Sequence, residues 1–139
     1  MIYIDTSALL RGILMGAPDH GEVADVLQDP TRVLISSQLL WLEADRTAIR
    51  LASESTALAG LPAEVTSALL RVEQVRLDRA IIDAARKIPQ VVKSLDAIHI
   101  ATAESLGKLV EFVMTYDKTM TAVLAARGVS VGTASQLLA

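Results

Sequence analysis

The sequence predicts an α/β domain of three layers, α/β/α, with a mostly parallel central sheet. Short apolar runs rich in β-branched residues alternate with longer helical patterns along the whole chain, as in sheets whose strands are joined by helical crossovers. The 139 residues correspond to about one domain. Neither an internal repeat nor a low-complexity tract interrupts the pattern, so we expect a single domain over residues 1–139.

The elements of the first half follow from apolar runs and from residues that begin or end helices. The motif Asp19-His20-Gly21-Glu22 resembles a capping box, and Ser36-Ser37 offers an N-cap to a long helix that is apolar on most faces and therefore expected to be largely buried. In order, we expect a strand at 2–4, a helix from Ala8, a helix after Asp19 that ends at Asp29-Pro30, a strand at 33–35 and a helix at 39–52.

The second half repeats the alternation. Pro62 suits the first turn of a helix, Ser94 is expected to cap another, Gly107 is expected to end a helix in the left-handed conformation, and a further helix is expected to end at Gly128. In order, we expect a helix from Pro62 to Arg71, a strand at 75–77, a helix at 79–88, a helix at 95–106, a strand at 112–115, a helix at 118–127 and a strand at 129–131.

The amino-acid composition excludes several classes of protein and of functional site. Thirteen basic and sixteen acidic residues give a net charge of −3, which argues against a histone-like coat protein but leaves room for a nuclease with a local basic rim. The absence of cysteine excludes disulfides, thiolate zinc sites and thiol catalysis. No apolar run approaches the ~18 residues of a membrane span, and the first residues lack the basic region of a secretory signal. We therefore expect a cytoplasmic protein without a membrane segment.

Four acidic residues stand where a charge is unexpected. Asp5 directly follows the first strand and Asp117 follows the strand at 112–115, whereas Asp96 and Glu43 lie within apolar helices. Each has a local explanation, because the three aspartates could cap or favour helix N-termini and Glu43 could pair with Arg46. Helices that begin at one edge of a sheet bring their first turns together, so we expect the four carboxylates to converge.

Converging carboxylates favour a divalent cation, because each raises the cost of ionising the next. Mg²⁺ or Mn²⁺ prefers oxygen ligands and would lower the pKa of a bound water, which suits phosphodiester hydrolysis. The spacing does not separate one ion from two. Thr6, Ser7 and Thr115 flank the strand-end aspartates and could orient them or bound waters, or could instead make turn and cap hydrogen bonds.

Basic and imidazole side chains near the acids allow two interpretations each. Arg46 and Arg50 share a helix face with Glu43, and Lys118 adjoins Asp117, so they could hold an RNA phosphate or form exposed salt bridges. His99 shares a face with Asp96 and is expected to bond to a neighbouring acid or carbonyl rather than to act as a base.

Four segments of the chain resemble the motifs of the PIN domain, and the third of them resembles its VapC-type toxins. The similarity extends from Ile2 to about Val131, whereas 53–74 matches no motif of the family. The matching residues are Ile2-Tyr3-Ile4-Asp5-Thr6-Ser7-Ala8-Leu9-Leu10, Glu43 on the mid-chain helix, Ser94-Leu95-Asp96-Ala97-Ile98-His99-Ile100-Ala101-Thr102-Ala103 and Thr115-Tyr116-Asp117.

The resemblance implies a PIN-like fold and Mg²⁺- or Mn²⁺-dependent endoribonuclease activity. It implies an acidic quartet of Asp5, Glu43, Asp96 and Asp117, with the three aspartates as metal ligands. It further implies the toxin of a type II toxin–antitoxin pair, masked by a cognate antitoxin and usually a homodimer.

Other functions fit the sequence less well. A receiver or haloacid-phosphatase domain also gathers aspartates around Mg²⁺, but it needs an acidic pair or a D-x-D motif where this chain has Asp5-Thr6-Ser7. A Ser-His-Asp triad is disfavoured because Ser7 lacks the glycines of a nucleophile elbow. A PIN-like binding module without turnover would lack one of the acids, and none is missing.

Overall fold

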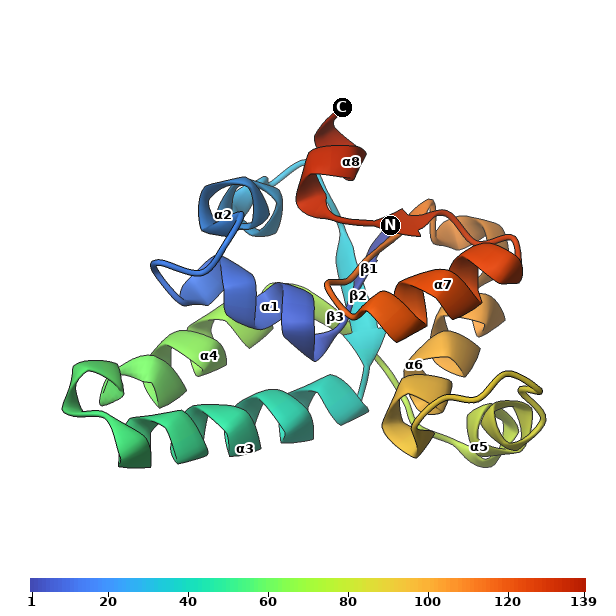
Figure 1. Ribbon diagram of the computed structural model, residues 1–139, viewed down its shortest axis with the longest axis horizontal. Coiled ribbons are helices and arrows are strands. Elements are labelled where there is room, and N and C mark those ends of the chain that lie inside the picture. The colour runs from blue at the N-terminus through green and yellow to red at the C-terminus, as the bar shows by residue number, and fades with distance from the viewer.

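A five-stranded parallel sheet forms the middle of the molecule (Figure 1). The computed structural model describes all of residues 1–139. The strand order is β3-β2-β1-β4-β5 and every pairing is parallel. The strands are β1 (Ile2–Ile4), β2 (Leu34–Ser37), β3 (Val72–Val75), β4 (Phe112–Met114) and β5 (Val131–Gly132).

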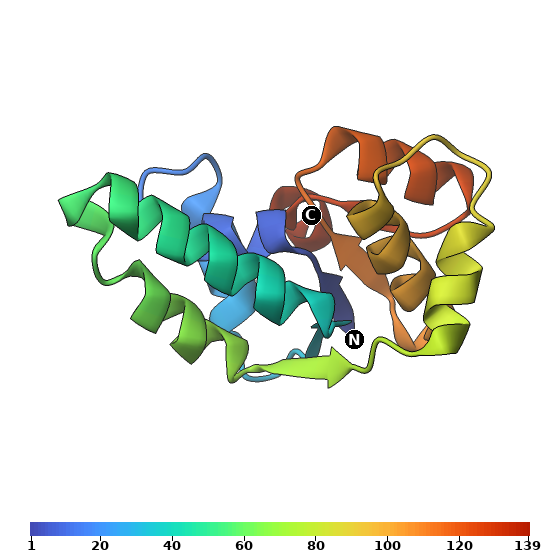
Figure 2. The same ribbon diagram turned by 90° about the horizontal axis from the view of Figure 1, so that it is seen from below.

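Helices cover both faces of the sheet, which confirms the predicted three-layer class (Figures 1 and 2). One layer contains α1 (Thr6–Ile13), α2 (His20–Gln28), α3 (Leu39–Glu54) and α4 (Leu61–Leu69). The opposite layer contains α5 (Arg79–Arg86), α6 (Ser94–Ser105) and α7 (Lys118–Ala126). Three short elements remain: the 3₁₀ turns η1 (Thr56–Leu58) and η2 (Gly107–Leu109) and the C-terminal helix α8 (Ala134–Leu138).

The alternation of side chains along the strands produces two separate cores. Ile2 and Ile4 point into the larger core, which β1 shares with α1 to α4. Tyr3, between them, points the other way into the core that includes Ile100 of α6 and Met120 of α7. A buried tyrosine therefore faces the α6 layer from the centre of the sheet.

The strand order places a topological switch point at β1. From β1 the chain adds β2 and β3 on one side, and later adds β4 and β5 on the other. The helices that follow β1 and β4 therefore leave in opposite directions, which opens a crevice beyond the carboxyl ends of these two strands. Asp5 and Asp117 follow β1 and β4, so the fold brings both to this crevice.

Three elements differ from the sequence prediction. β3 spans 72–75 rather than 75–77, because its register is set by pairing of Leu34 with Val72 in β2. β5 begins at Val131 rather than at 129, where it pairs with Val113. The helix α8 was not predicted, although Thr133 and Gln136 form a capping box at its start.

Several predicted caps are wrong or displaced. Asp19 adopts a left-handed conformation (φ 62°) and its side chain caps nothing, so the capping box of α2 does not form. Gln38 is the N-cap of α3, while the Ser37 hydroxyl accepts from the Leu39 N–H at 3.1 Å. Ser94 is the first residue of α6, and Lys93 occupies the cap position.

The helix α3 is buried on one face only, contrary to the prediction from its composition. Leu40 and Ala44 pack into the larger core, whereas Leu42 and Ile49 are 62% and 48% exposed. The reason is position: α3 runs along the outside of its layer and packs mainly against α4 (Figure 2). None of the helices combines the length and hydropathy that a membrane crossing requires.

Candidate active site

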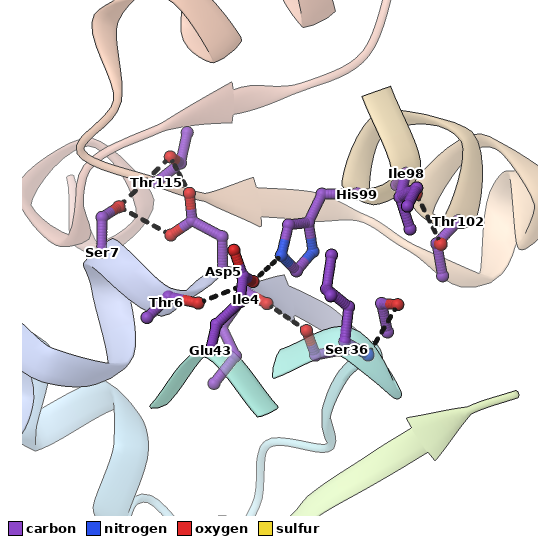
Figure 3. Close-up of polar contacts among 12 residues, drawn as sticks. Ile4, Asp5, Thr6, Ser7, Ser36, Glu43, Ile98, His99, Thr102 and Thr115 are labelled. Atoms are coloured by element: carbon purple, nitrogen blue, oxygen red, sulfur yellow. Dashed lines mark hydrogen bonds and ion pairs between the residues drawn. The ribbon is translucent and has the colours of Figure 1, made fainter. Parts of the chain in front are cut away.

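Asp5 is a buried carboxylate at the carboxyl end of β1. Its Oδ1 accepts hydrogen bonds from the Ala8 N–H at 3.0 Å and the Ser7 hydroxyl at 2.6 Å, and its Oδ2 accepts from the Thr115 hydroxyl at 2.5 Å (Figure 3). Burial raises the pKa of Asp5, while the bonds from Ser7, Thr115 and Ala8 oppose that rise. Asp5 is thus both the N-cap of α1 and a carboxylate of fixed orientation.

The hydroxyls of Ser7 and Thr115 join the ends of β1 and β4. The Ser7 oxygen accepts from the Tyr116 N–H at 2.9 Å, and the Thr115 oxygen accepts from the Asp117 N–H at 3.1 Å. Each hydroxyl therefore accepts from a backbone N–H and donates to Asp5. The two predicted roles, turn hydrogen bonding and orientation of the acid, are carried out by the same atoms.

Asp117 begins α7 at the end of β4. Its Oδ1 accepts from the Met120 N–H at 2.8 Å, as an N-cap does, while no protein donor bonds to its Oδ2. The side chain is half-buried, so the second oxygen can bind a ligand.

Asp96 lies in the first turn of α6 and accepts no hydrogen bond from the protein. Its pKa is raised, first by partial burial and then by the negative charge of Asp117, with smaller contributions from Asp5 and Glu43; His99 acts in the opposite direction. The structure therefore brings the four predicted acids into one electrostatic neighbourhood.

A cavity of about 320 Å³ lies beside this neighbourhood. Asp96 and Asp117 form part of its wall, together with Lys93 at the cap position of α6, Thr119 in the first turn of α7, and Val91-Val92. A wall with one lysine and two carboxylates suits an anionic ligand that binds together with a cation.

Glu43 reaches the site from α3 and is tied to the opposite layer. Its Oε1 accepts from the Thr6 hydroxyl at 2.9 Å and from His99 Nε2 at 2.7 Å (Figure 3). The predicted ion pair with Arg46 is absent, because the imidazole of His99 takes that place. The expectation that His99 bonds to an acid is confirmed.

The predicted RNA-contact residues are exposed. Arg50 forms an i,i+4 ion pair with Glu54 at 3.5 Å, the exposed salt bridge that was its alternative interpretation. Arg46 and Lys118 form no ion pair. These three side chains take no part in the hydrogen bonds around Asp5.

Sequence reasoning missed two residues that line or support the site. Lys93 lines the cavity, and the signal for it was its position three residues before Asp96 at a helix start. Tyr3 donates or accepts a hydrogen bond with His99 Nδ1 at 2.7 Å. The signal for Tyr3 was its hydroxyl within a buried strand, which requires a polar partner.

The donor set at this edge suits a hard divalent cation. Asp96, Asp117 Oδ2 and Asp5 Oδ2 are carboxylate oxygens with lone pairs left after the hydrogen bonds described above. As the side chains lie, no three acids or histidines are close enough to ligate one ion together. Mg²⁺ commonly takes one or two carboxylates and retains several waters, so the residues fit a site of that kind.

Comparison with known proteins decides the family. The family model of the PIN domain matches residues 2–124, which include all four acids. The chain belongs to the PIN-domain family. Ribonuclease VapC35 of Mycobacterium tuberculosis is 34% identical over 125 residues, which cover 86% of this chain and 87% of that protein.

Solved structures of PIN-domain relatives share the fold. VapC20 of Mycobacterium tuberculosis, a sarcin–ricin loop cleaving toxin, superposes with a TM-score of 0.66 at 18% identity and covers 93% of this chain and 96% of its own. A toxin–antitoxin complex from Klebsiella pneumoniae gives 0.69 at 20% identity, covering 96% of this chain and 98% of the other. These structures therefore share the fold of this chain.

Proposed function

We propose that this PIN-domain protein is an endoribonuclease dependent on Mg²⁺ or Mn²⁺. We further propose that it is the cytoplasmic toxin of a type II toxin–antitoxin pair. The observation that carries the proposal is the placement of the acids: Asp5 and Asp117 follow neighbouring strands at the switch point of the sheet, and Asp96 lines the same cavity as Asp117. The likeness to Ribonuclease VapC35 over most of both chains supports the choice of RNA as substrate.

In this proposal Asp5, Asp96 and Asp117 would supply carboxylate oxygens to the cation, one or two of them directly and the others through its bound waters, and nearby cationic side chains would hold the substrate. Mg²⁺ or Mn²⁺ bound there would supply an activated water and would offset the negative charge of the phosphate. Hydrogen bonds from Ser7 and Thr115 hold the Asp5 side chain in one rotamer, so its Oδ2 is already positioned before a ligand binds. Asp96 and Asp117 present oxygens on the cavity wall.

Lys93 is the strongest candidate for a phosphate contact. It lines the same cavity as Asp96 and Asp117, and a lysine ammonium binds phosphate as a point charge. Arg46, Arg50 and Lys118 remain candidates for contacts further along the RNA, since they are exposed on the helices that carry Glu43 and Asp117. Contacts of this kind follow the phosphate path and do not define a base sequence.

The partners follow from the family. We propose a cognate antitoxin that covers the acidic edge, and a homodimer of this chain as the toxin. The likeness to a chain of the Klebsiella pneumoniae toxin–antitoxin complex supports the first partner. A pull-down of the tagged chain co-expressed with the product of the adjacent reading frame tests it.

The test of the activity is a matched pair of substitutions. Asp96→Asn should reduce RNA cleavage in Mg²⁺ or Mn²⁺ more than about 100-fold, beyond what residues behind a metal ligand usually cost. Asp83→Asn is the control, because Asp83 is a helical carboxylate whose ion pairs are with Arg79 and Arg86 on α5. Equal cleavage by the two variants would overturn the assignment. A wild-type chain that binds Mn²⁺ without cleaving RNA would instead indicate the binding module.

A further inference from the structure

A chain of hydrogen bonds crosses the molecule from one helical layer to the other through His99. His99 of α6 is 2% exposed, and its Nδ1 lies 2.7 Å from the Tyr3 hydroxyl of β1. Its Nε2 lies 2.7 Å from Glu43 Oε1 of α3 (Figure 3). Thr6 of α1 donates to the same Glu43 oxygen. Four elements thus converge on one imidazole and one carboxylate.

The partners determine where the imidazole protons lie. An ionised carboxylate accepts and cannot donate, so His99 Nε2 carries the proton of its bond to Glu43. The Tyr3 oxygen already accepts from the Ser37 N–H at 3.2 Å, which leaves the Tyr3 proton for Nδ1. The ring is therefore set in the Nε2–H form by a group on each side.

This arrangement fixes one oxygen of Glu43 and leaves the other available. Both donors, Thr6 and His99, bond to Oε1, and no protein donor bonds to Oε2. Glu43 is partly exposed at 21%, so without these bonds its flexible side chain would sample several rotamers. Its charge acts on Asp96, which places the carboxylate within the acidic neighbourhood.

We propose that His99 is a positioning residue for the reaction, oriented by Tyr3 and acting through Glu43. This inference rests on the proposed ribonuclease function. His99 does not line the cavity, so its contribution is to hold Glu43 in one orientation. Loss of the Nε2 donor lowers kcat, whereas RNA binding, which depends on exposed cations, stays unchanged.

Two amide substitutions separate this role from a structural one. Glutamine places an N–H near the position of Nε2, and asparagine places its polar atoms near the position of Nδ1. We expect His99→Gln to keep kcat within about 3-fold of wild type, whereas His99→Asn lowers kcat by about 10–100-fold with KM unchanged. Unfolding by urea, measured on both, gives the fraction folded in the assay.

Failure of the positioning role and failure of the proposed ribonuclease function give different experimental results. Cleavage by His99→Asn at the wild-type rate, or equal losses in both variants that follow their folded fractions, overturns the positioning role. A wild-type chain that cleaves no RNA in either metal ion refutes the proposed function itself, which is a different result.

A measurement on the metal-free wild-type chain does not depend on activity. Nitrogen-15 NMR of the His99 ring is expected to show a proton on Nε2. A bare Nε2 with the proton on Nδ1 overturns the inference, because His99 would then have nothing to donate to Glu43.

Discussion

Replacing Thr115 with valine removes the hydroxyl that holds the most buried acid of the site. Thr115 is 1% exposed and Asp5 5%, so water cannot easily replace the lost donor. A hydrogen bond to a charged group contributes about 1.5–3 kcal/mol and a neutral one about 0.5–1.5 kcal/mol. Thr115 makes one of each, to Asp5 Oδ2 and from the Asp117 N–H. We expect Thr115→Val to lower the free energy of unfolding by roughly 2–4 kcal/mol.

The assay is urea unfolding of the metal-free chain at neutral pH, followed by circular dichroism. Thr6→Val is the matched control, because the Thr6 hydroxyl also donates to a carboxylate, at 2.9 Å. Its acceptor Glu43 is 21% exposed and keeps the bond from His99, so we expect a cost below about 1 kcal/mol. Equal costs for the two valine variants would refute the argument that burial of the acid sets the magnitude.

Three further predictions concern pH, packing and RNA binding. Burial raises the pKa of Asp5, so the folded chain keeps that proton to higher pH than the unfolded chain and loses stability as the pH rises above the ordinary aspartate range. Asp5→Asn should therefore gain stability relative to wild type as the pH rises above about 4, the ordinary aspartate pKa, in urea titrations of the metal-free chain, and a stability difference that stays constant with pH would contradict this. Gly12→Ala should lower the free energy of unfolding by about 1–3 kcal/mol in thermal unfolding, because the added Cβ would lie 2.3 Å from Leu27 Cδ1. A higher melting temperature of this variant would show that α1 and α2 move apart without cost. Lys93→Ala should weaken RNA binding and reduce its salt slope by about one, whereas Lys108→Ala, away from the cavity, should not; equal slopes would remove Lys93 from the interface.

Elements with strong local signals were predictable. The strand at 2–4 was found as predicted, and Gly107 and Gly128 have the positive φ angles (55° and 80°) expected where helices end. β3 was misplaced by three residues because apolar and polar side chains are mixed over 72–77, which permits several registers, and its pairing with β2 selects one. Composition alone also predicted a buried α3, although the layer covers only one of its faces.

The acidic residues of the site were predictable for a related reason. Neighbouring parallel strands end at one edge of the sheet, so aspartates that follow two such strands lie close together regardless of the loop conformations. The residue that pairs with Glu43 was not predictable. Helical spacing offered Arg46, but α6 brings His99 within 2.7 Å from the opposite layer.

The amino-acid sequence by itself determined the fold class, the positions of most helices and the placement of Asp5 and Asp117 after two neighbouring strands, because these depend on patterns within a few residues or on strand ends. Only the tertiary structure decided which side chains bond to those acids. Tyr3, Glu43 and His99 are separated by tens of residues in the chain, and their contacts exist because the sheet holds two helical layers at a fixed separation on its two faces.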